Sequence, residues 1–171
     1  RVLQVFFDDP VPEGGGLQLR ELSRKTGIAP TSVKNHLRAL EKEGLITTRK
    51  HRIHDFPIYT SNRDNEKFKF YKRVNTFRLL FESGLVNYLQ ETCMPNAIVL
   101  FGSAAKGEDI RTSDLDIFVL CKERKLDLRR FEKAVGRPIS LLFCDEFKQL
   151  SDELKNNITN GVVLKGYLKV F

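Results

Sequence analysis

The chain has 171 residues, of which 41% are hydrophobic, so it can form one ordinary domain or two small ones with packed cores. No apolar run reaches the roughly 18 residues that a membrane-spanning helix needs. The three cysteines lack CxxC spacing, which argues against a disulfide scaffold or zinc finger and favours a cytoplasmic location. The net charge of +7 permits an anionic partner, but without a polybasic tail any nucleic-acid binding must come from a shaped surface.

Residues 1–61 are expected to form a compact helical domain that ends in a β-hairpin. A short apolar helix, RVLQVFF, precedes a turn-rich loop, and a second helix, LQLRELSRKTG, ends at Gly27. A third helix follows over Pro30–Glu43, with proline in its first turn and apolar residues along one face. The segment LITTRKHRIHDFPIYT then predicts two strands around a polar turn.

This order of elements, and the stretch LRELSRKTGIAPTSVKNHLRALEKEGLI, resemble a winged helix-turn-helix. The resemblance implies double-stranded DNA as partner, a role in transcription regulation and, as a prior for such regulators, a homodimer. Ala29 departs from the pattern, because a Ser or Thr helix cap is usual there. Winged helices also serve as protein-docking modules, and that alternative stays open. The residues expected to reach DNA from the recognition helix and the wing are Thr31, Ser32, Lys34, Asn35, Arg38, Arg49, Lys50 and Arg52.

Residues 62–94 are expected to be a linker of one or two helices. Aromatic and aliphatic residues, among them Phe68, Val74 and Phe81, recur there at helical spacing, and Gly84 marks a bend or break. Base stacking by these aromatics is one interpretation. Packing of the linker against both neighbouring domains is the favoured one.

From residue 95 to residue 171 strands and helices alternate, and two motifs there suggest chemistry. Gly102 and Ser103 follow the strand AIVLF and open a turn into a helix, where backbone N–H groups and a hydroxyl suit a phosphate. Asp114 and Asp116 flank Leu115 at the start of the apolar strand LDIFVLC. Alternate residues of a strand share a face, so the two carboxylates can converge on a hard cation such as Mg²⁺ or Mn²⁺.

Gly102-Ser103, ten further residues and Asp114-Leu115-Asp116 resemble the signature of the polymerase-β-like nucleotidyltransferases, and more narrowly the minimal nucleotidyltransferases of prokaryotes. The resemblance implies an α+β chain of two domains, the second a small mixed sheet flanked by helices. It implies a nucleoside triphosphate, such as ATP, bound with magnesium at Gly102 and Ser103, and Asp114 and Asp116 as metal-binding catalytic residues. Lys106 is a further candidate for the phosphates.

The superfamily carries a third carboxylate on a later strand, and the position that aligns with it is Ser140 in RPISLLFC. A hydroxyl is a weak magnesium ligand and no general base at neutral pH. Two hypotheses follow. The first is an enzyme that transfers a nucleoside monophosphate to a hydroxyl acceptor, for which a protein is one candidate. The second is a catalytically impaired, nucleotide-sensing transcription regulator.

Overall fold

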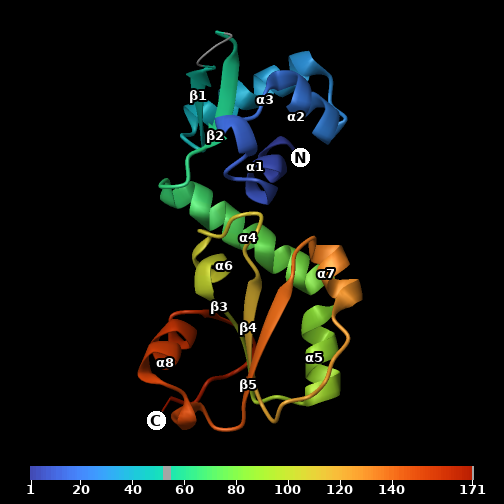
Figure 1. Cartoon of the computed structure of the whole chain (residues 1–171), viewed down its shortest axis with the longest axis vertical. Helices are drawn as coiled ribbons and strands as arrows, with labels where there is room; N and C mark the ends of the chain where they lie inside the picture. The colour runs from blue at the N-terminus through green and yellow to red at the C-terminus, as the bar shows by residue number, and fades with distance from the viewer. Residues whose placement is uncertain (52–54, 171) are drawn as a thin grey trace. The chain divides into compact units, whose positions relative to one another are not determined.

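The computed structural model describes residues 1–51 and 55–170. The chain divides into two compact units, Arg1–Lys72 (unit 1) and Arg73–Phe171 (unit 2) (Figure 1). The predicted α+β class is confirmed: helices and a two-stranded sheet form unit 1, and a four-stranded mixed sheet with helices forms unit 2. In the described part of the chain, no helix combines the length and the apolar character that crossing a membrane requires.

Unit 1 follows the predicted order of helices and hairpin. Gly27 ends the second helix in the left-handed conformation, with φ of 68°, and Pro30 opens the third in its first turn. The hairpin strands pair antiparallel. The elements are α1 (Val2–Asp8), η1 (Glu13–Gly15), α2 (Leu19–Thr26), α3 (Pro30–Lys42), β1 (Ile46–Lys50) and β2 (Pro57–Ser61).

The core of unit 1 joins its helices to its hairpin. Leu22 of α2 and Val33 of α3 are fully buried in a cluster that also holds Ile46 of β1. The cluster includes Phe68, whose ring lies 5.3 Å from that of Phe7 in an edge-to-face arrangement. Full burial of each such side chain contributes about 1.5–3 kcal/mol, so α3 is held firmly with its opposite side open to solvent.

The segment expected to be a helical linker forms α4 (Glu66–Glu82) and α5 (Leu85–Cys93). Gly84 separates them with φ of 79°, at the predicted break. The boundary between the two units lies within α4. The packing prediction is wrong for part of this helix: Val74 and Phe81 are 47% and 51% exposed, because the helix has more apolar positions around its circumference than one buried face can hold.

Unit 2 is built on a sheet with the strand order β5-β4-β3-β6. β4 pairs antiparallel with β3 and parallel with β5, and β6 pairs antiparallel with β3. The elements after α5 are β3 (Ala97–Phe101), α6 (Gly102–Lys106), β4 (Leu115–Leu120), α7 (Arg129–Val135), β5 (Ile139–Cys144), η2 (Phe147–Gln149), α8 (Asp152–Thr159) and β6 (Val162–Gly166).

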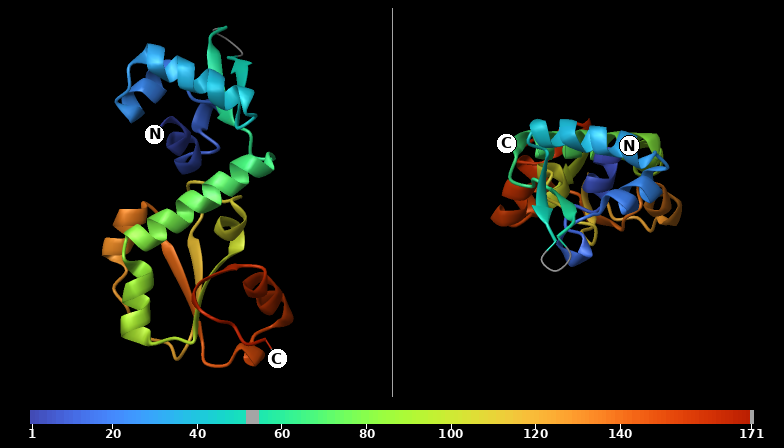
Figure 2. Two further views of the ribbon diagram at one scale, coloured as in Figure 1. Left: turned by 180° about the vertical axis from the view of Figure 1, so that it is seen from behind. Right: turned by 90° about the horizontal axis from the view of Figure 1, so that it is seen from above.

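The two faces of this sheet pack against different helices, as both views in Figures 1 and 2 show. Ile117 and its neighbours on one face join the side chains of α5 and α7 in one cluster. Phe118 and its neighbours on the other face join η2 and α8, with Phe147 6.1 Å from Phe118 between ring centroids. Since strand residues alternate, Asp116 shares the face of Phe118.

The segment KLDLRRFEKAV predicts a helix that begins near Lys125, but α7 begins only at Arg129. The Asp127 carboxylate accepts hydrogen bonds from the Arg129 backbone N–H at 3.1 Å and from its guanidinium at 2.9 Å and 2.6 Å. This local bonding offers the chain an alternative to helical hydrogen bonds and delays the start of the helix. The same bonds lower the pKa of Asp127 to about 2.

The cysteines are free thiols, as their spacing predicts. Cys121 and Cys144 each end an apolar run of the sequence, which predicts core thiols, but both are only partly buried, whereas Cys93 is buried. Burial, with Cys93 beside it, raises the pKa of the Cys121 thiol to about 11. Very little reactive thiolate is therefore present at neutral pH.

Candidate functional site

Chain topology brings the glycine–serine turn and the aspartate pair together in unit 2. Gly102 and Ser103 begin α6 directly after β3, whereas Asp114 lies one residue before β4 and Asp116 is the second residue of β4. In the antiparallel pairing of these strands Phe101 is opposite Asp116. The end of β3 and the start of β4 therefore meet at one end of the sheet.

Gly102 lies directly against the Asp116 carboxylate. A Cβ atom placed on Gly102 would come 2.3 Å from Oδ2 of Asp116, well inside van der Waals contact, and φ of Gly102 is +70°. Only glycine combines this backbone conformation with room for the carboxylate. This contact brings Gly102 of the first motif and Asp116 of the second motif together, so the two motifs are treated as one candidate site.

The electrostatics of the pair favour a bound cation. Asp116 is partly buried, and its pKa is raised first by burial and then by the negative charge of Asp114, while Arg137 opposes the shift. Asp114 itself is exposed. Two carboxylates that repel each other, one of them partly desolvated, are stabilised by a hard divalent cation, which prefers oxygen ligands. The donor set therefore fits one such ion. Within residues 1–51 and 55–170, no cluster of three or more His, Cys, Asp or Glu side chains could hold a metal.

The parallel register of β4 and β5 places Ser140 opposite Asp116. Partners in a strand pair present their side chains on the same face, so the exposed Ser140 lies beside the carboxylate. Ser140 is the residue that the resemblance to polymerase-β-like nucleotidyltransferases aligns with their third carboxylate. Ser140 therefore places a hydroxyl beside Asp116, where a carboxylate would form a trio with Asp114 and Asp116.

Arg137 also belongs to this region, although it is part of no motif that could be read from the sequence. It lies between α7 and β5 and forms an ion pair with Asp109, a residue that is only 1% exposed. Its guanidinium also donates to the backbone carbonyl of Ser113, the residue before Asp114. Lys106 is exposed in the last turn of α6.

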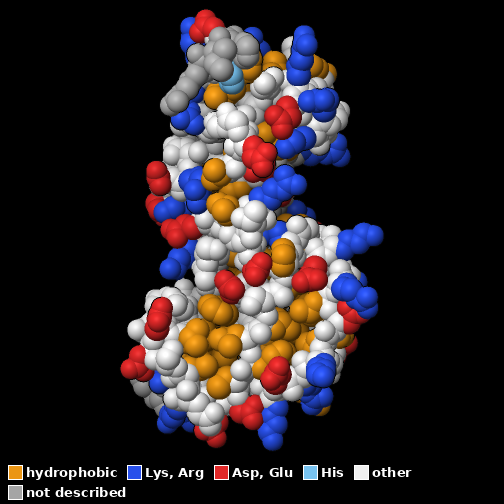
Figure 3. All heavy atoms as spheres, viewed as in Figure 1, with side chains coloured by type: hydrophobic (Ala, Val, Ile, Leu, Met, Phe, Trp, Pro, Cys, Tyr) orange, Lys and Arg blue, Asp and Glu red, His pale blue; other side chains and the backbone are white. Residues whose placement is uncertain are grey.

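Unit 1 presents the residues expected to contact DNA. The candidates on α3 all lie on its exposed side: Thr31, Ser32, Lys34, Asn35 and Arg38. Blue Lys and Arg side chains project from the part of unit 1 that holds α2 and α3 (Figure 3).

On the wing, Arg49 and Lys50 are exposed on β1, and Arg52 lies outside the described residues. The guanidinium of Arg49 donates to the Gly15 carbonyl at 3.3 Å. Lys50 forms an ion pair with Asp55 at 3.0 Å, which offsets part of its charge. The exposed ion pair is weak and salt-screened, so Lys50 can still exchange Asp55 for a phosphate.

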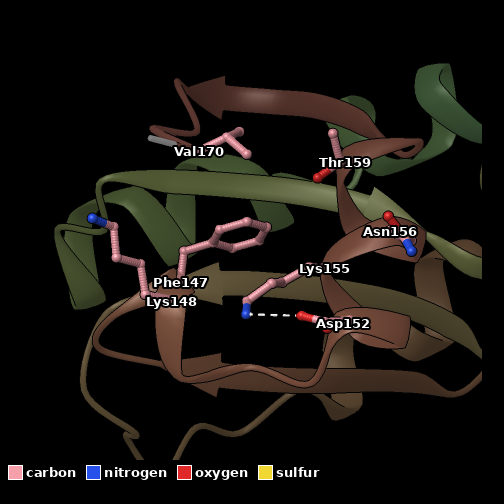
Figure 4. Close-up of a pocket in the computed structure, with 7 residues that line it drawn as sticks. All are labelled: Phe147, Lys148, Asp152, Lys155, Asn156, Thr159 and Val170. Atoms are coloured by element: carbon pink, nitrogen blue, oxygen red, sulfur yellow. Dashed lines mark hydrogen bonds and ion pairs between the residues drawn. The ribbon is translucent and has the colours of Figure 1, made fainter.

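A separate hollow of about 510 Å³ lies among η2, α8 and the carboxyl-terminal segment of unit 2 (Figure 4). Its lining is mixed: Phe147 forms an apolar wall, and Lys155 is paired with Asp152 at 3.2 Å. Gly102, Asp116 and Ser140 are not among its lining residues. The hollow is therefore not the site at the Asp-x-Asp motif.

Two protein families match the chain, one within unit 1 and one within unit 2. Residues 13–47 match the family described as winged helix-turn-helix DNA-binding, and residues 83–166 match the family described as polymerase beta, nucleotidyltransferase. No curated protein and no solved structure matches the chain. The two matches agree with the fusion of domains that the sequence motifs predicted.

The Gly102–Asp116 contact predicts that Gly102→Ala destabilises unit 2 more than a comparable glycine change. Gly136 has a similar φ of +74° but open space around its Cβ position, so Gly136→Ala introduces only the backbone strain. We expect that strain to cost about 1 kcal/mol in both variants, and the clash to add about 1–3 kcal/mol in Gly102→Ala. Urea unfolding measures both. Equal losses of unfolding free energy would contradict the close approach.

Proposed function

Because the chain joins a winged helix-turn-helix DNA-binding domain to a polymerase-beta-type nucleotidyltransferase domain, we propose that it binds duplex DNA and also binds a nucleoside triphosphate with a divalent cation. Unit 1 performs the first task and unit 2 the second. The observation that carries the nucleotide half is the Asp116 carboxylate packed against Gly102, with the negative charge of Asp114 acting on it.

In this proposal Asp114 and Asp116 would hold a divalent cation such as magnesium, which would supply positive charge to neutralise the phosphates. Burial and then the negative charge of Asp114 raise the pKa of Asp116, and a cation would relieve the repulsion between the two carboxylates. Ser103 donates its hydroxyl hydrogen to a phosphate oxygen, and Gly102 leaves room for the metal-binding carboxylate.

The reaction that such a site supports is transfer of a nucleoside monophosphate to a hydroxyl. A bond forms between the acceptor oxygen and the α-phosphorus, the bond from the α-phosphorus to the bridging oxygen breaks, and pyrophosphate leaves. The acceptor hydroxyl must also lose its proton. Ser140 stands beside Asp116 and cannot act as the base, so unit 2 favours nucleotide binding over rapid transfer.

The Ser140 observation favours a second candidate function. A domain that binds nucleotide and magnesium but transfers slowly can serve as a sensor coupled to DNA binding. Pyrophosphate release from labelled ATP distinguishes an active transferase from such a regulator. A protein acceptor, which would supply the hydroxyl, and a homodimer on a palindromic DNA site are further parts of the proposal.

For unit 1, we expect the double variant Lys34→Ala/Arg38→Ala to bind DNA about tenfold more weakly, because each residue is exposed on α3 and can neutralise a phosphate or contact a base. The slope of log affinity against log salt should fall by roughly one to two. Fluorescence anisotropy with a duplex selected from a random-sequence pool measures both quantities.

The matched control removes two exposed lysines of unit 2, Lys125→Ala/Lys133→Ala, and so changes the net charge equally. It should leave DNA binding close to that of the wild type. Equal affinity of the α3 variant and the wild type would exclude α3 as the DNA-contacting helix.

For unit 2, Asp116→Asn should abolish the magnesium-dependent part of ATP binding, because a neutral amide is a poor ligand for a hard cation. Ser103→Ala should weaken binding about threefold to tenfold, the value of one hydrogen bond. Calorimetry with ATP, in magnesium and in chelator, measures these changes. Asp152→Asn, which removes an exposed carboxylate of unit 2 outside the candidate site, should bind as the wild type does. Magnesium-independent ATP binding by the wild type would refute the site.

The position of Ser140 predicts that Ser140→Asp accelerates transfer. Aspartate there would stand beside Asp116, complete a trio of carboxylates and provide a base. General-base catalysis contributes about 10²–10⁴-fold, so we expect a gain of roughly one or more orders of magnitude in pyrophosphate release at saturating magnesium.

The matched control is Ser140→Asn, because asparagine has nearly the shape of aspartate but no charge. Its pyrophosphate release should stay as slow as that of the wild type. If the wild type is fast and Ser140→Asp is no faster, the base lies elsewhere in the protein.

A further inference from the structure

We propose that Arg137 is a positioning residue that holds the loop before β4, and with it the Asp114 carboxylate, in the geometry that receives the metal. This inference rests on the proposed function, because it assigns a role in the same site. It concerns a residue that touches neither nucleotide nor cation.

Asp114 has no regular secondary structure of its own. It lies between α6 and β4, at the end of a loop that runs from Gly107. Within the loop, the Ser113 N–H donates to the Ile110 carbonyl and the Ile110 N–H donates to Ser113 Oγ, both at 3.0 Å. These bonds close a local turn, but they do not attach the turn to the sheet.

The attachment comes from the segment between α7 and β5. Arg137 donates from Nε and Nη2 to the Ser113 carbonyl, at 3.1 Å and 3.0 Å. The next residue, Pro138, accepts a hydrogen bond from the Leu115 N–H at 2.9 Å. The backbone is therefore held on both sides of Asp114 by two consecutive residues.

The third contact of Arg137 makes this attachment rigid. Its Nη1 donates to the Asp109 carboxylate, in an ion pair with side-chain exposures of 15% for Arg137 and 0% for Asp109. A buried carboxylate without its cation is strongly unfavourable, so the pair fixes the guanidinium at one place. Arg137 thus joins an early and a late residue of the loop to the start of β5.

Only the planar fork of arginine serves this arrangement. Three guanidinium nitrogens reach two acceptors in different parts of the loop, whereas lysine has one nitrogen on a flexible stem. Arg137→Lys therefore keeps the positive charge and removes the bridge. This change separates the positioning of Asp114 from the general electrostatic effect of a cation near the site.

The first test measures amide hydrogen exchange of the full chain without nucleotide. In Arg137→Lys we expect the Ser113 and Leu115 amides to exchange about tenfold faster or more, because they belong to the released loop, while β3 amides keep their rates. The matched control is Arg129→Lys, which alters an exposed pair with Asp127 in the same unit. Unchanged exchange at Ser113 and Leu115 in Arg137→Lys would overturn the inference.

The second test measures ATP binding by calorimetry with magnesium and with chelator. Arg137→Lys should weaken magnesium-dependent binding about tenfold, the usual scale for residues that orient metal ligands, and leave magnesium-free binding unchanged. In an Asp114→Asn background it should have no further effect, since Arg137 acts through Asp114. Full magnesium-dependent affinity in Arg137→Lys, or an equal loss in both backgrounds, would overturn the inference.

If Arg137→Lys does not fold, Asp109→Asn replaces it, because this variant keeps Arg137 and removes the ion pair. It should shift exchange and magnesium-dependent binding in the same direction by smaller factors, and wild-type values of both would overturn the inference. A wild type that fails to bind ATP with magnesium would refute the proposed function and the metal half of this inference. The exchange experiment would still decide whether Arg137 holds the loop.

Discussion

The site in unit 2 depends on one constraint: Asp116 places a carboxylate in a strand whose other residues are buried. A charge in such a place is costly unless opposite charge or hydrogen bonds compensate it. The local structure accommodates it in two ways. Gly102 has no side chain to collide with the carboxylate, and the charge of Arg137 favours its ionised form. The neighbouring Asp114 acts in the opposite direction, which leaves a demand for positive charge that a metal ion can meet.

The neighbouring strands of the sheet and its core keep Asp116 in its place. β4 lies between β3 and β5, and both of its neighbours contribute to the site. β3 delivers Gly102 at its end, and β5 delivers Ser140 in register with Asp116. Because Leu115 and Ile117 anchor the opposite face in the core with α5 and α7, Asp116 cannot rotate away without loss of a large apolar contact. A one-residue slip of β4 would place its carboxylate in that core.

Much of this arrangement could be predicted from the sequence, and the limits have physical causes. Hydrophobic periodicity located the helices and strands, and the spacing of Gly102, Asp114 and Asp116 indicated a shared site. The contact of Gly102 with Asp116 depends on strand register, which local patterns do not determine. The Arg137–Asp109 pair links residues 28 positions apart in sequence, and neither belongs to a motif. Exposure of Val74 and Phe81 was missed because periodicity identifies apolar positions, not what covers them.

A nucleotidyltransferase must both bind a nucleotide and remove a proton from the acceptor hydroxyl, and Ser140 affects only the second requirement. Nucleotide binding draws on charge neutralisation, and a cation held by two carboxylates and the triphosphate can supply it. Transfer also requires that a hydroxyl proton be removed as the bond to phosphorus forms, and this needs a base beside the metal. The register of β4 and β5 puts a serine at that point. Under the proposed function, a site of this composition would bind a nucleotide and would transfer it slowly. If the proposal holds, slow transfer would let the nucleotide-bound state persist long enough to influence the DNA binding expected of the winged helix-turn-helix domain.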